Sequence, residues 1–142
     1  TVATGGEGIG QLTRDIAAKF KGRYSLVRGD IADREAVFDA VRGNNISVII
    51  NFAADSHVDR SIETPGTFIM TDCYGTYELL EAARAFKVER YHQISTDEVY
   101  GDIDPPGRSL ESDAVRPSSP YSASKTGGSP PSVGADSAPA AA

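Results

Sequence analysis

Apolar residues in the first 125 positions gather in short runs that predict the strands of a sheet. The run at residues 47–52 is almost continuous, which is typical of a parallel strand covered on both faces. Shorter β-leaning runs at residues 1–4, 24–28 and 90–95 predict three further strands.

Segments with helical spacing separate these runs. Asp33 is placed to cap a helix that ends at residues 43–44. The apolar residues that share one face of this helix are Ala36, Val37, Ala40 and Val41. After a polar loop at residues 53–64, Pro65 is expected to begin a long helix that reaches about Phe86. This alternation predicts an α/β fold built from right-handed βαβ units.

The C-terminal residues have a different composition. Residues 126–142 are rich in Pro, Gly, Ser and Ala and contain no aromatic residue. Such a segment buries too little surface to offset the entropy lost on ordering. We therefore expect one α/β domain at residues 1–125 and a low-complexity tail at 126–142 that is disordered or foreign to the fold.

Composition and charge narrow the class of protein. The 142 residues are 39% hydrophobic and carry a net charge of −6, which disfavours nucleic acid as a partner. Apolar runs are too short for a membrane span, and Cys73 is the single cysteine. His57 and His92 are isolated, so we expect no metal site. These features indicate a soluble, cytoplasmic protein.

A glycine cluster follows the first expected strand. Glycines at residues 5–10 would let the backbone approach a pyrophosphate at a helix start, although such a cluster by itself is more often a simple turn. Only thirteen residues separate Gly10 from Tyr24, too few for a helix and a strand. Either residues 11–19 form the helix and a second strand is absent, or a larger piece is missing. The carboxylate that would bind the adenosine ribose cannot be located.

A polar cluster marks the end of the strand at 90–95. Thr96 offers a hydroxyl, and Asp97 and Glu98 offer paired carboxylates. Two close carboxylates repel, so that one can keep its proton while the other ionises, which supplies an acid and a base. A polar turn at a strand end is the alternative interpretation.

Tyr121 and Lys125 follow with YxxxK spacing, which places both on one face of a helix. An ammonium beside a phenol lowers the phenol pKa, so Tyr121 is expected to act as a base nearer neutral pH. Together with Thr96, this pair predicts a triad for hydride transfer.

Several segments resemble dTDP-glucose 4,6-dehydratases, which belong to the extended short-chain dehydrogenases. Residues 51–61, 94–101 and 117–125 carry the resemblance, and residues 29–31 and 75–84 agree with it. The resemblance implies an NAD-binding, Rossmann-type doubly wound parallel sheet, incomplete in this chain. It also implies a separate sugar-nucleotide domain and a homodimer.

The resemblance also implies roles for the polar residues. Tyr121 would remove the proton of the sugar 4-hydroxyl, Lys125 would lower its pKa and hold the nicotinamide ribose, and Thr96 would hydrogen-bond the reacting oxygen and so contact the substrate. Glu98 would remove the C5 proton, and Asp97 would protonate the departing 6-hydroxyl. NAD would take the C4 hydride and return it to C6, converting dTDP-glucose to dTDP-4-keto-6-deoxyglucose.

Cofactor contacts follow from the same resemblance. They would come from Gly5, Gly8, Ile9, Gly10, Leu12, Thr13, Asp30, Ile31, Phe52, Ala53, Ala54, Ser56, Thr71, Tyr121 and Lys125. Ser56 would also lie near the sugar. The pair at residues 12–13 would follow the family's second strand, which implies that the first helix and second strand are missing together.

The sequence departs from the family in the glycine loop, at Asp55, at Asp72 and beyond Lys125, and the last two bear most on the site. Asp72 stands where an asparagine is expected, and its charge is expected to weaken the local hydrogen-bond network. Gly and paired Pro at residues 126–131 should end the helix at Lys125, leaving that lysine without an anchor. The sugar-nucleotide domain is not in the chain, so we expect a fragment or altered form of a dehydratase.

Two alternatives remain. A sugar-nucleotide epimerase or decarboxylase needs Thr96, Tyr121 and Lys125 but not the Asp97–Glu98 pair. A truncated NAD-binding or interaction module without chemistry would also agree with the short glycine loop.

Overall fold

The computed structural model describes residues 7–55 and 58–129. The strand expected at residues 1–4 and most of the tail, residues 130–142, lie outside the described residues. Helix α1 (Glu7–Lys19) comes first, followed by α2 (Arg34–Gly43) and strand β1 (Val48–Asn51). No helix of the described residues is long and apolar enough to cross a bilayer.

Two parallel strands form the sheet of the described residues, β1 and β2 (Arg90–Gln93). Val48 pairs with Arg90 and Asn51 with Gln93, so both strands end at the same edge. The helices between them are α3 (Val58–Glu63), α4 (Pro65–Phe68), the π-helical segment η1 (Ile69–Gly75) and α5 (Thr76–Ala85). Both predicted strands are confirmed, as is the helical crossover that parallel pairing requires.

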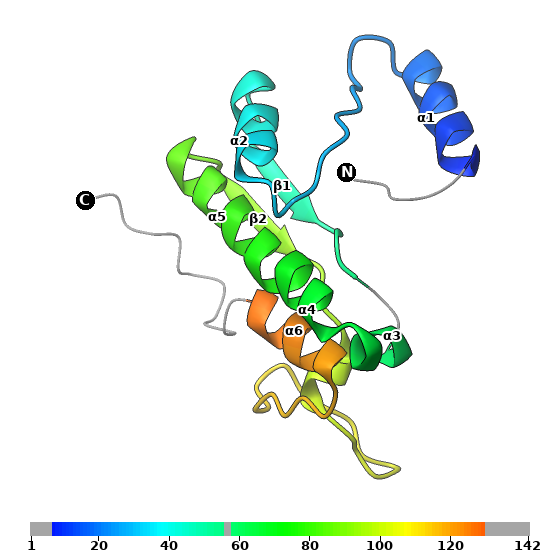
Figure 1. Ribbon diagram of the computed structural model, residues 1–142, viewed down its shortest axis with the longest axis vertical. Helices are drawn as coiled ribbons and strands as arrows, with labels where there is room; N and C mark the ends of the chain where they lie inside the picture. The colour runs from blue at the N-terminus through cyan, green and yellow to red at the C-terminus, as the bar shows by residue number, and fades with distance from the viewer. Residues whose placement is uncertain (1–6, 56–57, 130–142) are drawn as a thin grey trace.

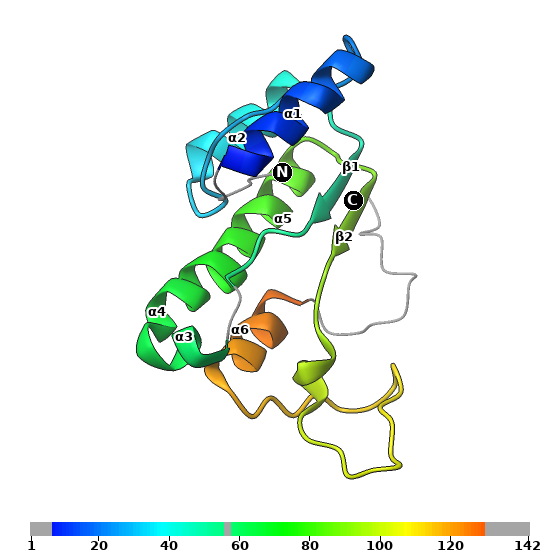
Figure 2. The ribbon, with the colours of Figure 1, turned by 90° about the vertical axis from the view of Figure 1, so that its right-hand side faces the viewer.

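Helix α2 begins where the sequence predicts. The Asp33 carboxylate accepts the backbone N–H groups of Glu35 and Ala36 at 3.0 and 3.2 Å, and Asn44 is the C-cap. Val37 and Val41 are buried, so the predicted apolar face is the one that packs. Figure 2 shows α2 and α5 on one side of the sheet.

The hydrophobic core lies between α2, α5 and β1. Ile31, Val37, Val41 and Ala82 are its buried members. The partly buried residues around them are Phe38, Ile46, Ile49, Ala53, Leu79, Phe86 and Val88. Burial of each large apolar side chain contributes about 1.5–3 kcal/mol, so this cluster fixes α2 and α5 against the strand.

The long helix predicted from Pro65 to about Phe86 is confirmed and runs through α4, η1 and α5. Its middle is π-helical, a geometry that is frequent at functional sites. Gly75 lies there against Ile31, and a Cβ at this position would stand 2.6 Å from the Ile31 side chain. The loop predicted at residues 53–64 is wrong in part, because α3 occupies its second half.

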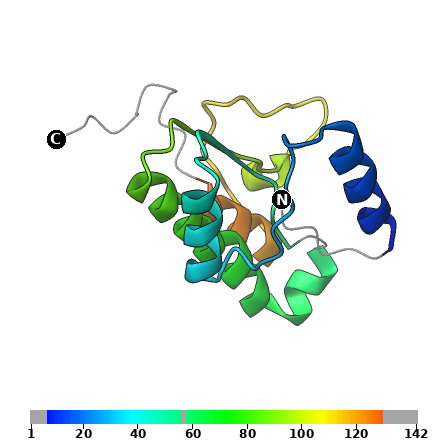
Figure 3. The same ribbon diagram turned by 90° about the horizontal axis from the view of Figure 1, so that it is seen from above.

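Two expectations about the sheet are wrong. Residues 24–28 run without strand pairing because β1 pairs with β2 alone among the described residues, and Leu26 and Val27 remain 42% and 47% exposed. The second face of β1 is also uncovered, since Val48 and Ile50 are 47% and 55% exposed. Figures 1 and 3 show α1 standing apart from the sheet and its helices.

Helix α6 (Pro120–Gly128) extends three residues beyond Lys125, where the sequence predicted its end. The two glycines allow this extension because they pack closely on η1. A Cβ on Gly127 would lie 2.8 Å from Cys73 Sγ, and one on Gly128 would collide with the backbone oxygen of Asp72. Tertiary packing therefore overrides the low helix propensity of glycine. The tail boundary at residue 126 is wrong by the same three residues.

Candidate active site

A buried polar network closes the carboxyl ends of the two strands. Asn51 Nδ2 donates to Gln93 Oε1 at 3.0 Å and to Thr76 Oγ1 at 3.4 Å, and Tyr91 donates to the same Gln93 oxygen at 2.6 Å. Asn51 Oδ1 accepts the backbone N–H of Ala53. The network therefore ties the segment that leaves β1 to the end of β2. This network was not predicted from the sequence, although Asn51, a polar residue at the end of an apolar run, was a usable signal.

Thr96 begins the short 3₁₀ helix η2 (Asp97–Tyr100). Its hydroxyl oxygen accepts the Glu98 backbone N–H and donates to Asp97 Oδ1, both at 3.3 Å. Val99 is buried and holds η2 against the fold, while the side chains of Asp97 and Glu98 are exposed. The structure thus brings the three predicted residues together. That one carboxylate keeps its proton stays a prediction.

Helix α6 carries Tyr121 and Lys125. Its start is fixed by a capping box in which Ser119 and Ser122 bond each other's backbone N–H groups, with Pro120 in the first turn. The Tyr121 ring meets the buried ring of Phe68 edge-on, with centroids 6.4 Å apart. Lys125 is 8% exposed, and its Nζ lies 5.9 Å from the Tyr121 ring centroid. Lys125 is therefore anchored in the fold, contrary to expectation.

Tyr121 lies near η2, because α6 packs against η2 and the polar groups of η2 act on the Tyr121 phenol. Burial raises the pKa of Tyr121 above its ordinary value, and Glu98, Asp72 and Asp97 raise it further, while the Thr96 hydroxyl opposes them. The prediction that the pKa of Tyr121 is lowered is therefore wrong for this chain without bound ligands. Several carboxylates surround the phenol, and burial disfavours the phenolate more than the polar contacts favour it.

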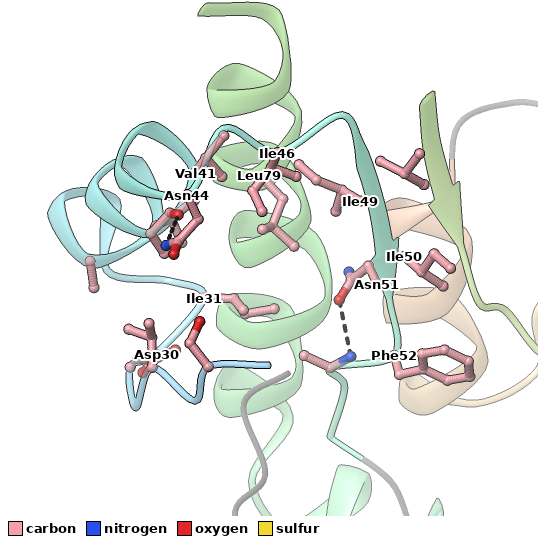
Figure 4. Close-up of a pocket in the computed structure, with 18 residues that line it drawn as sticks. Asp30, Ile31, Val41, Asn44, Ile46, Ile49, Ile50, Asn51, Phe52 and Leu79 are labelled. Carbon is pink, nitrogen blue, oxygen red and sulfur yellow. Dashed lines mark hydrogen bonds between the residues drawn. The ribbon is translucent and has the colours of Figure 1, made fainter. Parts of the chain in front are cut away.

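Part of the expected cofactor contacts line one cleft of about 450 Å³ beside β1. Asp30, Ile31, Phe52 and Ala53 are among its lining residues. Figure 4 shows Asp30 and Phe52 on opposite sides, with the Phe52 ring turned away from Asp30. The Asp30 carboxylate accepts the Ala32 backbone N–H at 2.9 Å, and Ile31 is only 7% exposed because it belongs to the core.

The remaining expected contacts are scattered. Ala54 is half-buried after β1, and Thr71 is half-buried in η1. Gly8, Ile9, Gly10, Leu12 and Thr13 all lie inside α1, so the pair at residues 12–13 does not follow a strand. Residues 8–10 are helical where a loop was expected, while Gly5 and Ser56 lie outside the described residues.

No group of three His, Cys, Asp or Glu side chains within residues 7–55 and 58–129 could hold a metal ion.

Comparison with known proteins identifies the family. The sequence profile described as GDP-mannose 4,6 dehydratase matches residues 4–130. The chain belongs to this family. A low-salt glycan biosynthesis protein, Agl12 of Haloferax volcanii, is 50% identical over 73% of this chain and 33% of its own length. A dTDP-glucose 4,6-dehydratase of Streptomyces niveus is 48% identical over 74% of this chain and 30% of its own.

A solved family structure has a similar fold. The dTDP-glucose 4,6-dehydratase DesIV of Streptomyces venezuelae, with NAD and TYD bound, matches with a TM-score of 0.72 and 43% identity. The match covers 81% of this chain and 35% of DesIV. This likeness confirms the Rossmann-type α/β fold. The chain spans about a third of the length of the curated relatives it matches.

Proposed function

We propose that this chain supplies the cofactor-binding and catalytic residues of an NAD-dependent 4,6-dehydratase that converts dTDP-glucose to dTDP-4-keto-6-deoxyglucose. The observation that carries the proposal is the convergence of Tyr121, Thr96 and the Asp97–Glu98 pair beside the carboxyl edge of the sheet. Ligands of open α/β sheets bind at this edge. The relatives named dTDP-glucose 4,6-dehydratase support the choice of substrate.

The residues beside β1 and on α6 fit NAD. The apolar lining that Ile49 and Ala53 contribute suits a flat aromatic ring, and the exposed carboxylate of Asp30 can accept hydrogen bonds from an adenine or ribose group. The largely buried ammonium of Lys125 can donate to ribose hydroxyls. The helical position of residues 8–10 leaves the pyrophosphate contact as the least supported part. When bound, NAD accepts a hydride from C4 of the sugar and later returns it to C6.

Tyr121 and Thr96 serve the first half of the reaction. The phenolate of Tyr121 takes the proton of the 4-hydroxyl as the C4–H hydride leaves, so that a C4 ketone forms. Thr96 donates a hydrogen bond to the same oxygen and holds it in place. Because the pKa of Tyr121 is raised in the chain, proton removal is expected to become faster as the pH rises toward that value.

The carboxyl pair serves the second half. A C4 ketone acidifies the C5 proton, which a carboxylate such as that of Glu98 can then remove. Asp97 gives a proton to the C6 oxygen, the C6–O bond breaks, and water leaves as a C5=C6 double bond forms. Glu98 would return its proton to C5, and the bound cofactor would supply the hydride to C6, which completes the product. The exposure of both side chains fits contact with a substrate that enters from solvent.

The test uses a chimera in which residues 24–128 of this chain replace the corresponding segment of the full-length Streptomyces niveus dehydratase. We expect the chimera to form the 4-keto-6-deoxy sugar with NAD, and its Glu98→Gln variant to lose turnover by about 10²–10⁴-fold, as for a lost general base. A 4-epimerase would interconvert the sugar and tolerate Glu98→Gln. Epimerised product from both versions would overturn the proposal in favour of the epimerase.

Calorimetric titration of the 142-residue chain with NAD tests the remaining alternative. The proposal is supported if the heat of NAD binding is lost in Lys125→Met but kept in Arg84→Met. Arg84 is the control because it lies on the exposed face of α5. An absence of binding together with an inactive chimera would favour a module without chemistry.

We further propose that the protein acts in the cytoplasm as a homodimer, with no nucleic-acid or membrane partner. Met70, Tyr74 and Tyr77 are 51%, 40% and 50% exposed and recur at helical spacing along η1 and α5. An exposed apolar stripe of this kind favours a protein contact. The net charge of −6 disfavours binding to anionic surfaces. Sedimentation of the chain and of Tyr77→Glu tests the dimer.

A further inference from the structure

Asp72 is a buried carboxyl that the proposed reaction does not use. It lies in η1 and is 3% exposed. Its Oδ1 accepts the backbone N–H of Asp55 at 3.0 Å, and its Oδ2 lies 2.8 Å from Ser124 Oγ. The ion pairs found within the described part of the chain join Arg34 to Glu78, Arg42 to Asp39 and Arg84 to Glu81, so none neutralises Asp72.

The protons around Ser124 do not suffice if Asp72 is ionised. Ser124 Oγ lies 2.8 Å from Asp72 Oδ2 and also 2.8 Å from the backbone oxygen of Tyr121. A serine hydroxyl has one proton to donate, and a carbonyl oxygen can only accept. The single Ser124 proton can serve only one of these two contacts in full, and both become full hydrogen bonds when the other partner, Asp72, donates one of them.

We propose that Asp72 is a neutral carboxylic acid, protonated on Oδ2, that donates to Ser124 Oγ while Ser124 donates to the Tyr121 carbonyl. Each proton then has one acceptor, and Oδ1 remains free to accept the Asp55 N–H. The chain of bonds runs from the π-helical segment to the backbone of the residue that carries the proposed catalytic phenol. Asp72 is thus a positioning residue for α6.

Burial agrees with a neutral Asp72. It raises the pKa of Asp72 above its ordinary value, and the Asp55 carboxylate adds the smallest contribution in the same direction. A donating Ser124 hydroxyl, Lys125 and the Asp55 N–H act in the opposite direction. Cys73 and Tyr121 are the other titratable groups that Asp72 affects. A neutral carboxyl avoids a buried, unpaired negative charge beside both groups, which would be costly.

Protonation also explains the departure from the family pattern. The resembling family is expected to have an asparagine here, and the charge of Asp72 was expected to weaken the network. An asparagine amide accepts at its oxygen and donates from its nitrogen. A protonated aspartic acid offers the same pair of functions. The network is therefore preserved, and its loss is expected only when Asp72 ionises.

Infrared difference spectroscopy tests the protonation state directly. The 142-residue chain, labelled with ¹³C-carboxyl aspartate, is compared with Asp72→Asn at neutral pH. We expect a carboxylic-acid C=O band that is absent in Asp72→Asn and retained in the matched control Asp55→Asn. A carboxylate band in place of the acid band would overturn the proposal. This measurement requires no turnover, so a negative result here is distinct from a failure of the proposed function. Only the consequence for Tyr121 rests on the proposed function.

Two further measurements cover the case in which Asp72→Asn fails to fold. Ser124→Ala removes the hydroxyl that accepts the Asp72 proton, so the C=O band of the Asp72 acid should move to the frequency of an acid without a hydrogen bond. An unchanged band would contradict the hydrogen bond from Asp72 to Ser124. The second measurement uses stability. Because the folded-state pKa lies above 3.8, the stability that Asp72 contributes is present below that pH and is lost as the pH rises through the raised pKa. If Asp72 donates to Ser124, loss of this acceptor lowers the folded-state pKa of Asp72, so wild-type stability should fall relative to Ser124→Ala over this interval. If Ser124 instead donates to a carboxylate, wild-type stability should rise relative to Ser124→Ala, and that result would overturn the proposal.

Discussion

Helices α6 and α1 both contain glycines but differ in what surrounds them. In α6, Ser122, Ser124, Lys125 and Gly128 are buried, and Ser124 reaches Asp72 across 52 positions of the chain. The structure describes the side chains of residues 13–19 in α1, and none of them is buried. Figure 1 shows this helix apart from the sheet. Contacts distant in sequence therefore fix the proposed catalytic residues, whereas the described side chains of α1 lie at the surface.

Two phenylalanine substitutions test this difference most strongly. Phe68 is 1% exposed and packs on Tyr121, so Phe68→Ala should lower the free energy of unfolding by about 3–5 kcal/mol. Phe20, just after α1, is 39% exposed, and the cations of Lys19 and Arg23 lie 5.6 and 5.5 Å from its ring centroid. Phe20→Ala should cost no more than about 1 kcal/mol. Urea unfolding measures both, and equal losses would contradict the comparison.

Two glycines give the next largest difference. Gly128→Ala would place a Cβ against the backbone oxygen of Asp72 and 3.2 Å from Thr76 Oγ1, so α6 must move. We expect a loss of about 1–3 kcal/mol, as for overpacking. Gly66→Ala in α4 meets nothing within 4 Å and should stabilise by about 0.4–1 kcal/mol. Thermal unfolding distinguishes the two, and a neutral Gly128→Ala would mean that α6 does not pack closely on η1.

The accuracy of sequence-based prediction follows the same division. The cap of α2, the strand at 48–51 and the helix with Tyr121 and Lys125 were predictable because spacing and capping chemistry are local. The π-helical turn, the Asn51–Gln93 network and the extension of α6 were not, because each depends on partners at least 25 positions away. The strand at 24–28 failed for a related reason, since a strand needs a neighbour that local sequence cannot supply.

One alanine in each region gives a smaller, matched test. Ala82 is fully buried in α5, and Ala82→Gly should lower global stability by about 1 kcal/mol through backbone entropy, with a further loss from the vacated contact. Ala18→Gly makes the same change on exposed α1. It should weaken that helix locally and leave the unfolding midpoint of the sheet unchanged. Hydrogen exchange, measured together with denaturant unfolding, distinguishes local from global effects. An equal shift of the unfolding midpoint in both variants would mean that α1 unfolds together with the core.

The last prediction concerns charge and involves no loss of packing. The pKa of Tyr121 is raised first by burial and then by carboxylates, among which Glu98 acts more strongly than Asp72 or Asp97. Glu98→Gln should therefore lower the pKa of Tyr121, and Asp97→Asn should lower it less. Tyrosinate absorbance, taken as the difference from Tyr121→Phe, follows this one phenol through a pH titration. Glu81→Gln on the outer face of α5 is the control and should leave the titration unchanged. If Glu98→Gln raised the pKa or left it unchanged, η2 would not face Tyr121, and the proposed acid, base and phenol would not share one site.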